Sequence, residues 1–139
     1  MATTTAQITL TSTDIADNAL SISNTMTLTT AGTETGITET TGLARKKVAS
    51  ASLADLITVA NTDVTAAKSA KVYIKNTSTA TDKYVLIGIG DSSGTPIYIG
   101  RLYGGDWMLF PWDANSGEDI TLTMSDATET IIEYMVFFE

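Results

Sequence analysis

The segment Asp113–Asp119 places oxygen-bearing side chains at alternate positions between two apolar segments, as calcium-binding loops do. The fifth position of this loop, where an EF-hand has Asp or Asn, is Gly117, and the twelfth position is not a glutamate. We therefore interpret the segment as a hairpin turn. We expect neither a metal site nor a cofactor.

Two acidic residues stand inside otherwise apolar segments, and a pair of carboxylates can in principle hydrolyse a glycosidic bond. Asp106 follows Gly104 and Gly105, where we expect it to cap a tight turn. Glu133 lies in the apolar C-terminal segment, and we predict that it forms an ion pair with Arg101. The other acidic residues cluster in predicted turns, where solubility explains them.

The chain contains neither histidine nor cysteine. Their absence removes Ser-His and Cys-His catalysis, disulfides and the usual Cys/His zinc sites. Because no carboxylate pair is placed for catalysis either, we expect no catalytic residues and predict that the protein is not an enzyme.

Large aromatic side chains gather in the segment Ile97–Trp112. Two β-rich runs meet there at Gly104 and Gly105, which can adopt the positive φ angles of a tight reversal, and we predict a hairpin around which the rest packs. Its aromatic residues could stack on a sugar. We favour core and subunit interface, where Trp and Tyr are enriched. The four residues concerned are Tyr98, Tyr103, Trp107 and Trp112.

The chain is acidic, with 8 basic and 16 acidic residues and a formal net charge of −8. Phosphate binding needs clustered Lys and Arg, and the basic run at residues 45–47 is short enough to be a solvated edge. The chain starts without a recognisable secretion signal, and no apolar run approaches the roughly 20 residues of a membrane span. We expect a soluble, unprocessed chain with no nucleic-acid partner and no membrane partner.

Residues 1–45 are rich in threonine and poor in large apolar side chains. Residues 7–11 and 20–28 alternate in the manner of strands, with a turn at 14–18 between them and a loop at 31–36 after them. Asn24 stands where an apolar residue is expected, which predicts a bend or a bulge. The segment buries too little to offset its conformational entropy alone. It is either an N-terminal arm lying on a neighbouring subunit or a set of outer strands of the same sandwich.

Residues 46–139 carry the clearest strand signals. We expect strands at 70–76 and 120–124, a strand covered on both faces at 84–90, the hairpin at 97–112 and a central strand at 131–138. A short strand at 48–52 overlaps a possible helical turn at 52–57, which begins with a capping-box-like Ser52 and Asp55. With turns every ten to fourteen residues or so, the chain predicts an all-β, antiparallel sandwich or jelly roll of about eight strands.

Three segments of this domain carry a family resemblance: Ala70–Ser78, the run from Ile99 to Trp112 with its GRL, GGD and LFPW stretches, and Glu133–Glu139. Together they resemble small virion proteins of tailed bacteriophages, notably jelly-roll capsid decoration or cement proteins. The resemblance covers about residues 65–139. It implies a structural protein on the capsid surface that binds the major capsid protein and other copies of itself, most commonly as a trimer.

The favoured hypothesis is therefore a non-enzymatic virion protein that decorates and stabilises a phage capsid. The alternatives are a carbohydrate- or receptor-binding module of a tail fibre or tail tip, and a structural component of the neck or tail. The predicted interface combines the first thirty residues with part of the aromatic set: Thr3, Thr4, Ile8, Leu10, Tyr103, Trp107 and Trp112.

Overall fold

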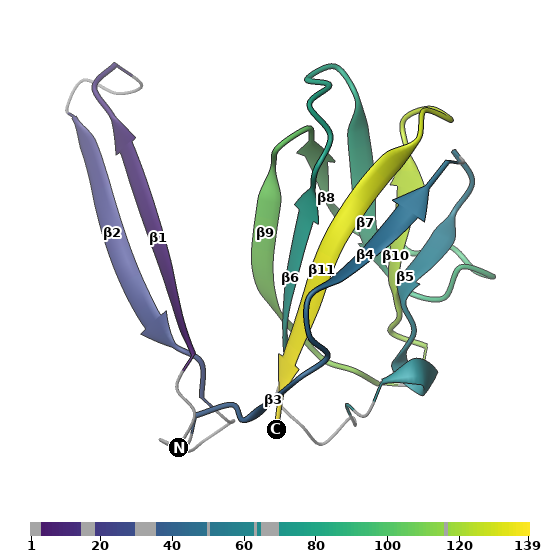
Figure 1. The fold of residues 1–139 in the computed structure, drawn as a ribbon, viewed down its shortest axis with the longest axis horizontal. Helices are drawn as coiled ribbons and strands as arrows, with labels where there is room; N and C mark the ends of the chain where they lie inside the picture. The colour runs from purple at the N-terminus through teal and green to yellow at the C-terminus, as the bar shows by residue number, and fades with distance from the viewer. Residues whose placement is uncertain are drawn as a thin grey trace. The chain divides into compact units, whose positions relative to one another are not determined.

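The computed structural model describes residues 4–14, 19–29, 36–49, 51–62, 64, 70–115 and 117–139. The chain divides into two compact units, residues 1–38 and residues 39–139. Figure 1 shows their strands in sequence order. The division falls before the predicted boundary at residue 45, because the strands that follow Thr38 pair within the second unit.

The first unit contains an antiparallel pair of strands, which we call the ribbon: β1 (Thr5–Ser12) and β2 (Leu20–Thr27). Thr5 pairs with Thr27 and Ser12 with Leu20, with no shift of register between them. The predicted bulge at Asn24 is therefore wrong, since an exposed ribbon face accepts an amide without bending. Most of the predicted turn at 14–18 and of the loop at 31–36 lies outside the described residues.

The second unit is an antiparallel β-sandwich, which confirms the predicted fold class. Its strands form two sheets whose order, counting β4 to β11 as one to eight, is 1-8-3-6 and 2-7-4-5, the arrangement of a jelly roll. We call them the five-stranded sheet, in which β3 also pairs with β11, and the four-stranded sheet. Within the described residues there are eleven strands in all, because β1, β2 and β3 add to the eight of the sandwich.

The five-stranded sheet contains β3 (Glu39–Thr40), β4 (Ala44–Val48), β6 (Ala70–Asn76), β9 (Trp107–Trp112) and β11 (Thr130–Phe138). The four-stranded sheet contains β5 (Ala54–Ile57), β7 (Tyr84–Ile89), β8 (Ile97–Tyr103) and β10 (Ile120–Met124). A 3₁₀ turn, η1 (Val59–Asn61), follows β5. No helix of the described residues is long and apolar enough to cross a membrane.

Most successive strands of the sandwich lie in different sheets, and β7 with β8 is the one consecutive pair that forms a hairpin. The hairpin predicted for residues 97–112 is therefore wrong. β8 pairs with β7 and β9 pairs with β6, so the chain between them crosses from one sheet to the other. We call this crossing, residues 103–106, the arch.

The core lies between the two sheets, where both contribute inward-facing aliphatic side chains. In β6, Ala70, Val72 and Ile74 are buried while the intervening residues are partly exposed, as its alternation predicts. β11 is central, since it pairs with β6 on one side and with β3 and β4 on the other. β7 is also internal to its sheet, although its outward-facing residues, including Tyr84 and Leu86, are only half-buried.

The predicted helical turn at 52–57 and the short strand at 48–52 are both wrong. The structure instead forms β4 earlier and β5 later, so that Val48, Leu56 and Ile57 are all in the core. Asp55, the expected capping residue, accepts hydrogen bonds from the backbone N and the Oγ of Ser92 at 3.1 and 2.7 Å. These contacts between distant segments outweigh a weak local helix signal.

Candidate functional site

The ribbon has one apolar face and one hydroxyl-rich face. Residues directly opposite each other in an antiparallel pair share a face, so the register groups the apolar side chains of both strands together. This apolar face is made of Ala6, Ile8, Leu10, Leu20, Ile22 and Met26, with Asn24 and Ser12 among them. The other face contains Ser, Thr and Gln, and neither strand carries a charged residue.

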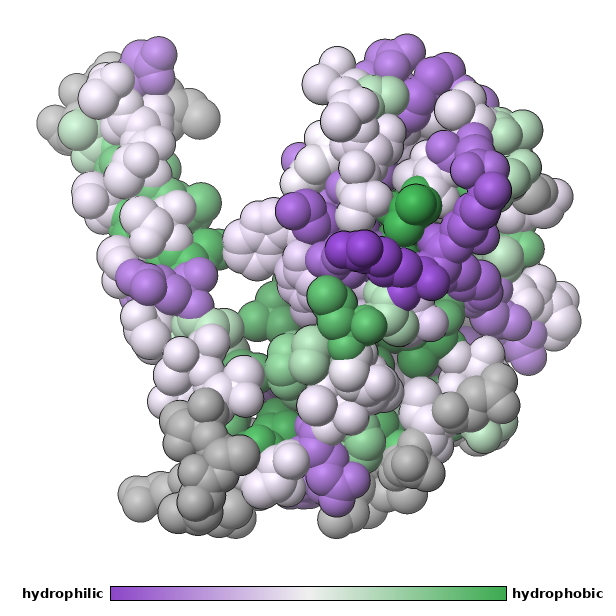
Figure 2. All heavy atoms as spheres, viewed as in Figure 1, coloured by the Kyte–Doolittle hydropathy of each residue, from purple (hydrophilic) through white to green (hydrophobic). Residues whose placement is uncertain are grey.

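The apolar face of the ribbon is open in the single chain. Ile8, Leu10, Ile22 and Met26 retain 43, 47, 39 and 49% of their accessible surface, and Figure 2 shows the apolar side chains of the ribbon in green. A two-stranded ribbon is marginally stable in water unless further strands or a packed surface cover it. These residues are therefore the candidate contact surface of the ribbon.

The arch is held by backbone hydrogen bonds and by Asp106, which confirms the predicted capping role. Asp106 Oδ2 accepts from the Tyr103 backbone N at 2.9 Å, and the Asp106 N donates to the Tyr103 carbonyl at 3.0 Å. Gly105 has φ +90° and donates its N–H to the Asn76 carbonyl at 3.0 Å. Asn76 in turn donates its backbone N–H to Asp106 O, so β6 fixes the arch.

The aromatic residues predicted to form an interface differ in their exposure. Tyr103 begins the arch and Trp107 follows it, and they are 38 and 49% exposed, so both are accessible. Trp112 is 3% exposed in the core, and its Nε1 donates to the Glu118 carbonyl at 2.8 Å. Its predicted place at the interface is wrong, because its position at the end of β9 faces the opposite sheet. Tyr98 is exposed on β8, and its hydroxyl lies 3.2 Å from the Oγ1 of Thr123.

The N-terminal interface residues lie on the ribbon or next to it. Ile8 and Leu10 are on its apolar face, and Thr4 is half-buried with its carbonyl accepting from Leu28 N at 2.9 Å. Thr3 lies outside the described residues. Their role in an interface stays a prediction. Ile22 and Met26 belong to the same surface, and the shared parity of 20, 22, 26 and 28 was the signal that could have added them.

The predicted ion pair between Glu133 and Arg101 is not formed. Glu133 Oε2 lies 2.9 Å from the Nη2 of Arg45, which is directly opposite in β4. Arg101 belongs to the other sheet, where its guanidinium lies 4.6 Å from the centre of the Tyr84 ring. The basic run of β4 is thus partly engaged, and Lys46 Nζ also donates to the carbonyl of Asp55.

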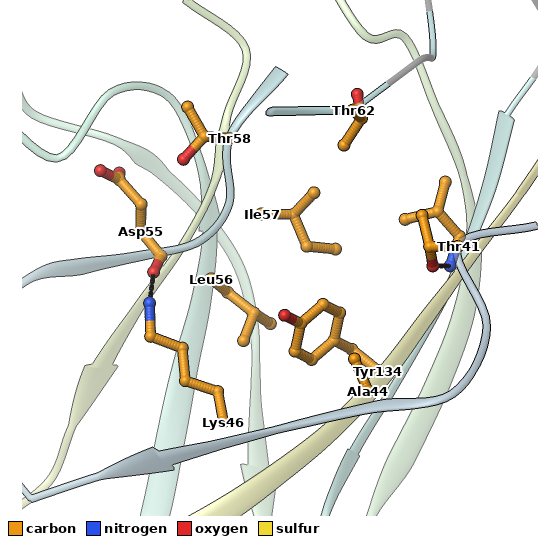
Figure 3. Close-up of a pocket in the computed structure, with 10 residues that line it drawn as sticks. Thr41, Ala44, Lys46, Asp55, Leu56, Ile57, Thr58, Thr62 and Tyr134 are labelled. Atoms are coloured by element: carbon orange, nitrogen blue, oxygen red, sulfur yellow. Dashed lines mark hydrogen bonds between the residues drawn. The ribbon is translucent and has the colours of Figure 1, made fainter. Parts of the chain in front are cut away.

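A cleft of about 560 Å³ opens on the side of the sandwich where β4 and β5 lie. Figure 3 shows Tyr134 and Leu56 near its centre, with Lys46 bound to the backbone of Asp55 at one end. The lining residues are Thr41, Ala44, Lys46, Asp55, Leu56, Ile57, Thr58, Thr62, Tyr134 and Val136. Its lysine and its aspartate both serve hydrogen bonds that join segments of the sandwich, so neither is poised for proton transfer.

The segment that resembles a calcium loop uses its oxygens to hold the fold. Asp119 Oδ1 accepts from Val59 N at 2.7 Å, and Asp113 Oδ2 accepts from Asn115 Nδ2 at 2.6 Å. The segment joins β9 to β10 in the opposite sheet, so it is a crossing rather than the predicted hairpin turn. Among the residues that the structure describes, no group of three or more His, Cys, Asp or Glu could hold a metal ion.

Neighbouring groups shift the pKa values of Asp126 and Tyr73, among others. The ammonium of Lys83 and the N–H and hydroxyl of Thr128 hold the pKa of Asp126 at about 2, which ties the turn before β11 to the start of β7. Burial and the carboxylate of Glu133 raise the pKa of Tyr73 on the outside of the five-stranded sheet. Both arrangements link neighbouring segments of the sandwich.

The fold and the site together define a jelly-roll sandwich with an appended apolar ribbon. No family model and no curated protein matches the chain. A solved structure described as "Bacillus endospore appendages form a novel family of disulfide-linked pili" is 16% identical, with a TM-score of 0.46 over 74% of this chain and 90% of the other. This likeness is distant.

Proposed function

We propose that the protein is a non-enzymatic structural component of a phage virion, which decorates the capsid and stabilises it by binding the shell and neighbouring copies. The observation that carries this proposal is the ribbon, whose uncharged apolar face is open in the single chain. Contiguous exposed apolar surface marks sites of contact with other macromolecules. The phage component of the proposal comes from the resemblance of residues 65–139 to capsid decoration proteins.

Co-sedimentation with phage capsids that lack the protein tests this role. Leu10→Asp places a carboxylate on the apolar face, and Thr9→Asp places the same group on the opposite face as a matched control. Burying a leucine contributes about 1.5–3 kcal/mol to the free energy of binding. We therefore expect Leu10→Asp to weaken capsid binding by about tenfold or more. Thr9→Asp should bind like the unmodified chain. Undiminished capsid binding by Leu10→Asp would contradict the proposal.

The carbohydrate-binding alternative keeps one supporting observation, the exposed Trp107, whose ring lies 6.5 Å from that of Tyr73. Against it, Trp112 is in the core, and Tyr98 lies on a strand of the other sheet. The four aromatic residues therefore do not form one platform. A glycan-array signal that is lost in Trp107→Ala would favour this alternative, whereas ring symmetry and copy number in the virion identify a neck or tail component.

A further inference from the structure

The five-stranded sheet has an apolar outer face of its own. Val72 and Ile74 of β6 face the core, so Tyr73 between them lies on the outside with the residues that pair with it in β11 and β9. The register forms two rows across β11, β6 and β9: Met135, Tyr73, Leu109 and Phe137, Lys71, Pro111. All but Lys71 are apolar or aromatic; Pro111 is exposed and the other five residues are half-buried.

Charges limit this outer face at one end. The next row across the same strands is Glu133, Lys75 and Trp107, and Glu133 also pairs with Arg45 of β4. This charged row ends the apolar surface on that side. A partner that covers the apolar rows therefore has to be uncharged where it meets them, as both strands of the ribbon are.

The open strand edges beside the arch are less suited to receive the ribbon. The register of β7 with β8 shifts between Ile87 and Gly88, and Arg101 adds a charge to β8. Pro111 in β9 lacks the N–H that a new strand would need. Irregular register, charge and proline are devices that prevent pairing at an edge. Packing of one apolar face on another is consequently favoured over addition of a strand.

The strands that carry the two apolar faces are similar in length. Each ribbon strand has 8 residues and is about 26 Å long, while β6 and β11 have 7 and 9 residues. A ribbon about 10 Å wide covers about 260 Å² of a sheet and buries about 520 Å² in total from both partners. Two such contacts bury about 1,040 Å², close to the roughly 1,000 Å² expected of a biological interface. A copy that both gives and receives a ribbon reaches this area.

We propose that the ribbon of one copy packs with its apolar face on the outer face of the five-stranded sheet of a second copy. A second copy carries a fitting surface, because its ribbon strands have no charge and the two apolar rows of the sheet contain one lysine only. The ribbon and the sandwich are separate compact units, so one copy can supply a ribbon without unfolding its sandwich. This contact deepens the proposed structural role but is measurable without a capsid.

Cross-linking between two variants tests the contact, because the full chain has no cysteine of its own. Leu10→Cys, on the apolar face of the ribbon, is mixed with Met135→Cys and treated with a short bis-maleimide. We expect a covalent dimer that contains one copy of each variant. The matched control, Thr9→Cys with Met135→Cys, should give little dimer because Thr9 lies on the other face.

Three outcomes would overturn the inference. Equal cross-linking of Thr9→Cys shows that the contact is not specific to the apolar face. Dimers of Leu10→Cys alone, with none to Met135→Cys, show that two ribbons pack on each other. If the double variant carrying both cysteines forms a bond only within one chain, the ribbon covers the sheet of its own copy.

The mass in solution provides the second measurement. The unmodified chain should be a dimer or trimer by light scattering, and Leu10→Asp should dissociate at least tenfold more readily than Thr9→Asp. A monomeric unmodified chain would overturn the inference while leaving capsid binding to be measured separately. An assembled chain that fails to bind capsids would instead contradict the proposed function alone.

Discussion

Replacing Gly104 by alanine would place a methyl group against two backbone carbonyls at the arch. A Cβ built there lies 2.8 Å from the carbonyl oxygen of Ser78 and closer still to that of Ala80. Neither oxygen belongs to a flexible side chain, so the segment after β6 or the arch itself has to move. Forced backbone shifts of this kind cost about 1–3 kcal/mol, and we expect the upper part of that range.

Alanine substitutions at two further glycines should destabilise the chain less than Gly104→Ala and serve as comparisons. Gly105 has open space around its Cβ position but φ +90°, so Gly105→Ala should cost about 1–2 kcal/mol through backbone strain alone. Gly100 in β8 has neither a close neighbour nor a positive φ, and Gly100→Ala should stay within about 1 kcal/mol of the unmodified chain. We expect Gly100→Ala to be the most stable of the three variants, Gly105→Ala to be intermediate and Gly104→Ala to be the least stable.

Urea and thermal unfolding followed by tryptophan fluorescence measure this order, because Trp112 is buried in the core. For a unit of about 100 residues, 1 kcal/mol changes Tm by about 4–8 °C, so Gly104→Ala should lower Tm by roughly 10–20 °C. If Gly104→Ala and Gly100→Ala unfold at the same temperature and the same urea concentration, the close approach of the arch to residues 78–80 is refuted.

Three further predictions concern single polar groups. The pKa of Asp126 is lowered to about 2, so its stabilising effect is complete above about pH 4 and is lost as the pH falls toward 2; Asp126→Asn should flatten the stability profile over that window in acid titrations. Asn76→Ala should cost about 2–3 kcal/mol in urea unfolding, since its buried amide donates to the Leu102 carbonyl at 3.0 Å and accepts from Ser78 N; a change below about 0.5 kcal/mol would contradict this. Glu133→Gln should bring the raised pKa of Tyr73 closer to 10.0 in tyrosinate absorbance, with Tyr73→Phe identifying its signal; an unchanged titration would refute the contribution of Glu133.

The sequence was sufficient for those strands whose signal is local. The alternation in residues 70–76 reflects one buried and one outward face, and β6 has those bounds and that burial pattern. The ending at 131–138 is apolar on both parities because β11 is central and carries an apolar outer face. The all-β class and the jelly-roll expectation follow from such runs and the turns between them.

The pairing of the strands was not predictable in the same way. Two glycines between β-rich runs indicate a reversal, but a hairpin and a crossing between sheets both need one. The choice is made by the other partners of these strands: β9 pairs with the distant β6, and β8 pairs with the preceding β7. For the same reason Glu133 pairs with Arg45 rather than with Arg101, since the ion pair depends on which sheet each strand joins.

One part of the candidate site could be predicted from the sequence and the other could not. The apolar parity of the ribbon can be read from residues 6–10 and 20–26, and the register then places both sets on one face. The outer face of the five-stranded sheet could not be found from one strand, because Tyr73 stands between two lysines in the sequence and looks solvated. Only pairing with Leu109 and Met135 on either side makes its surroundings apolar.

Charge then explains why these two faces are suited to each other rather than to the rest of the surface. The chain has twice as many acidic as basic residues, and most acidic side chains occupy turns, where they keep separate copies apart. The ribbon strands have no charge, and the apolar rows of the sheet include one lysine only. Because repulsion is weakest where these surfaces meet, the distribution of charge favours the proposed contact between the ribbon and the sheet face.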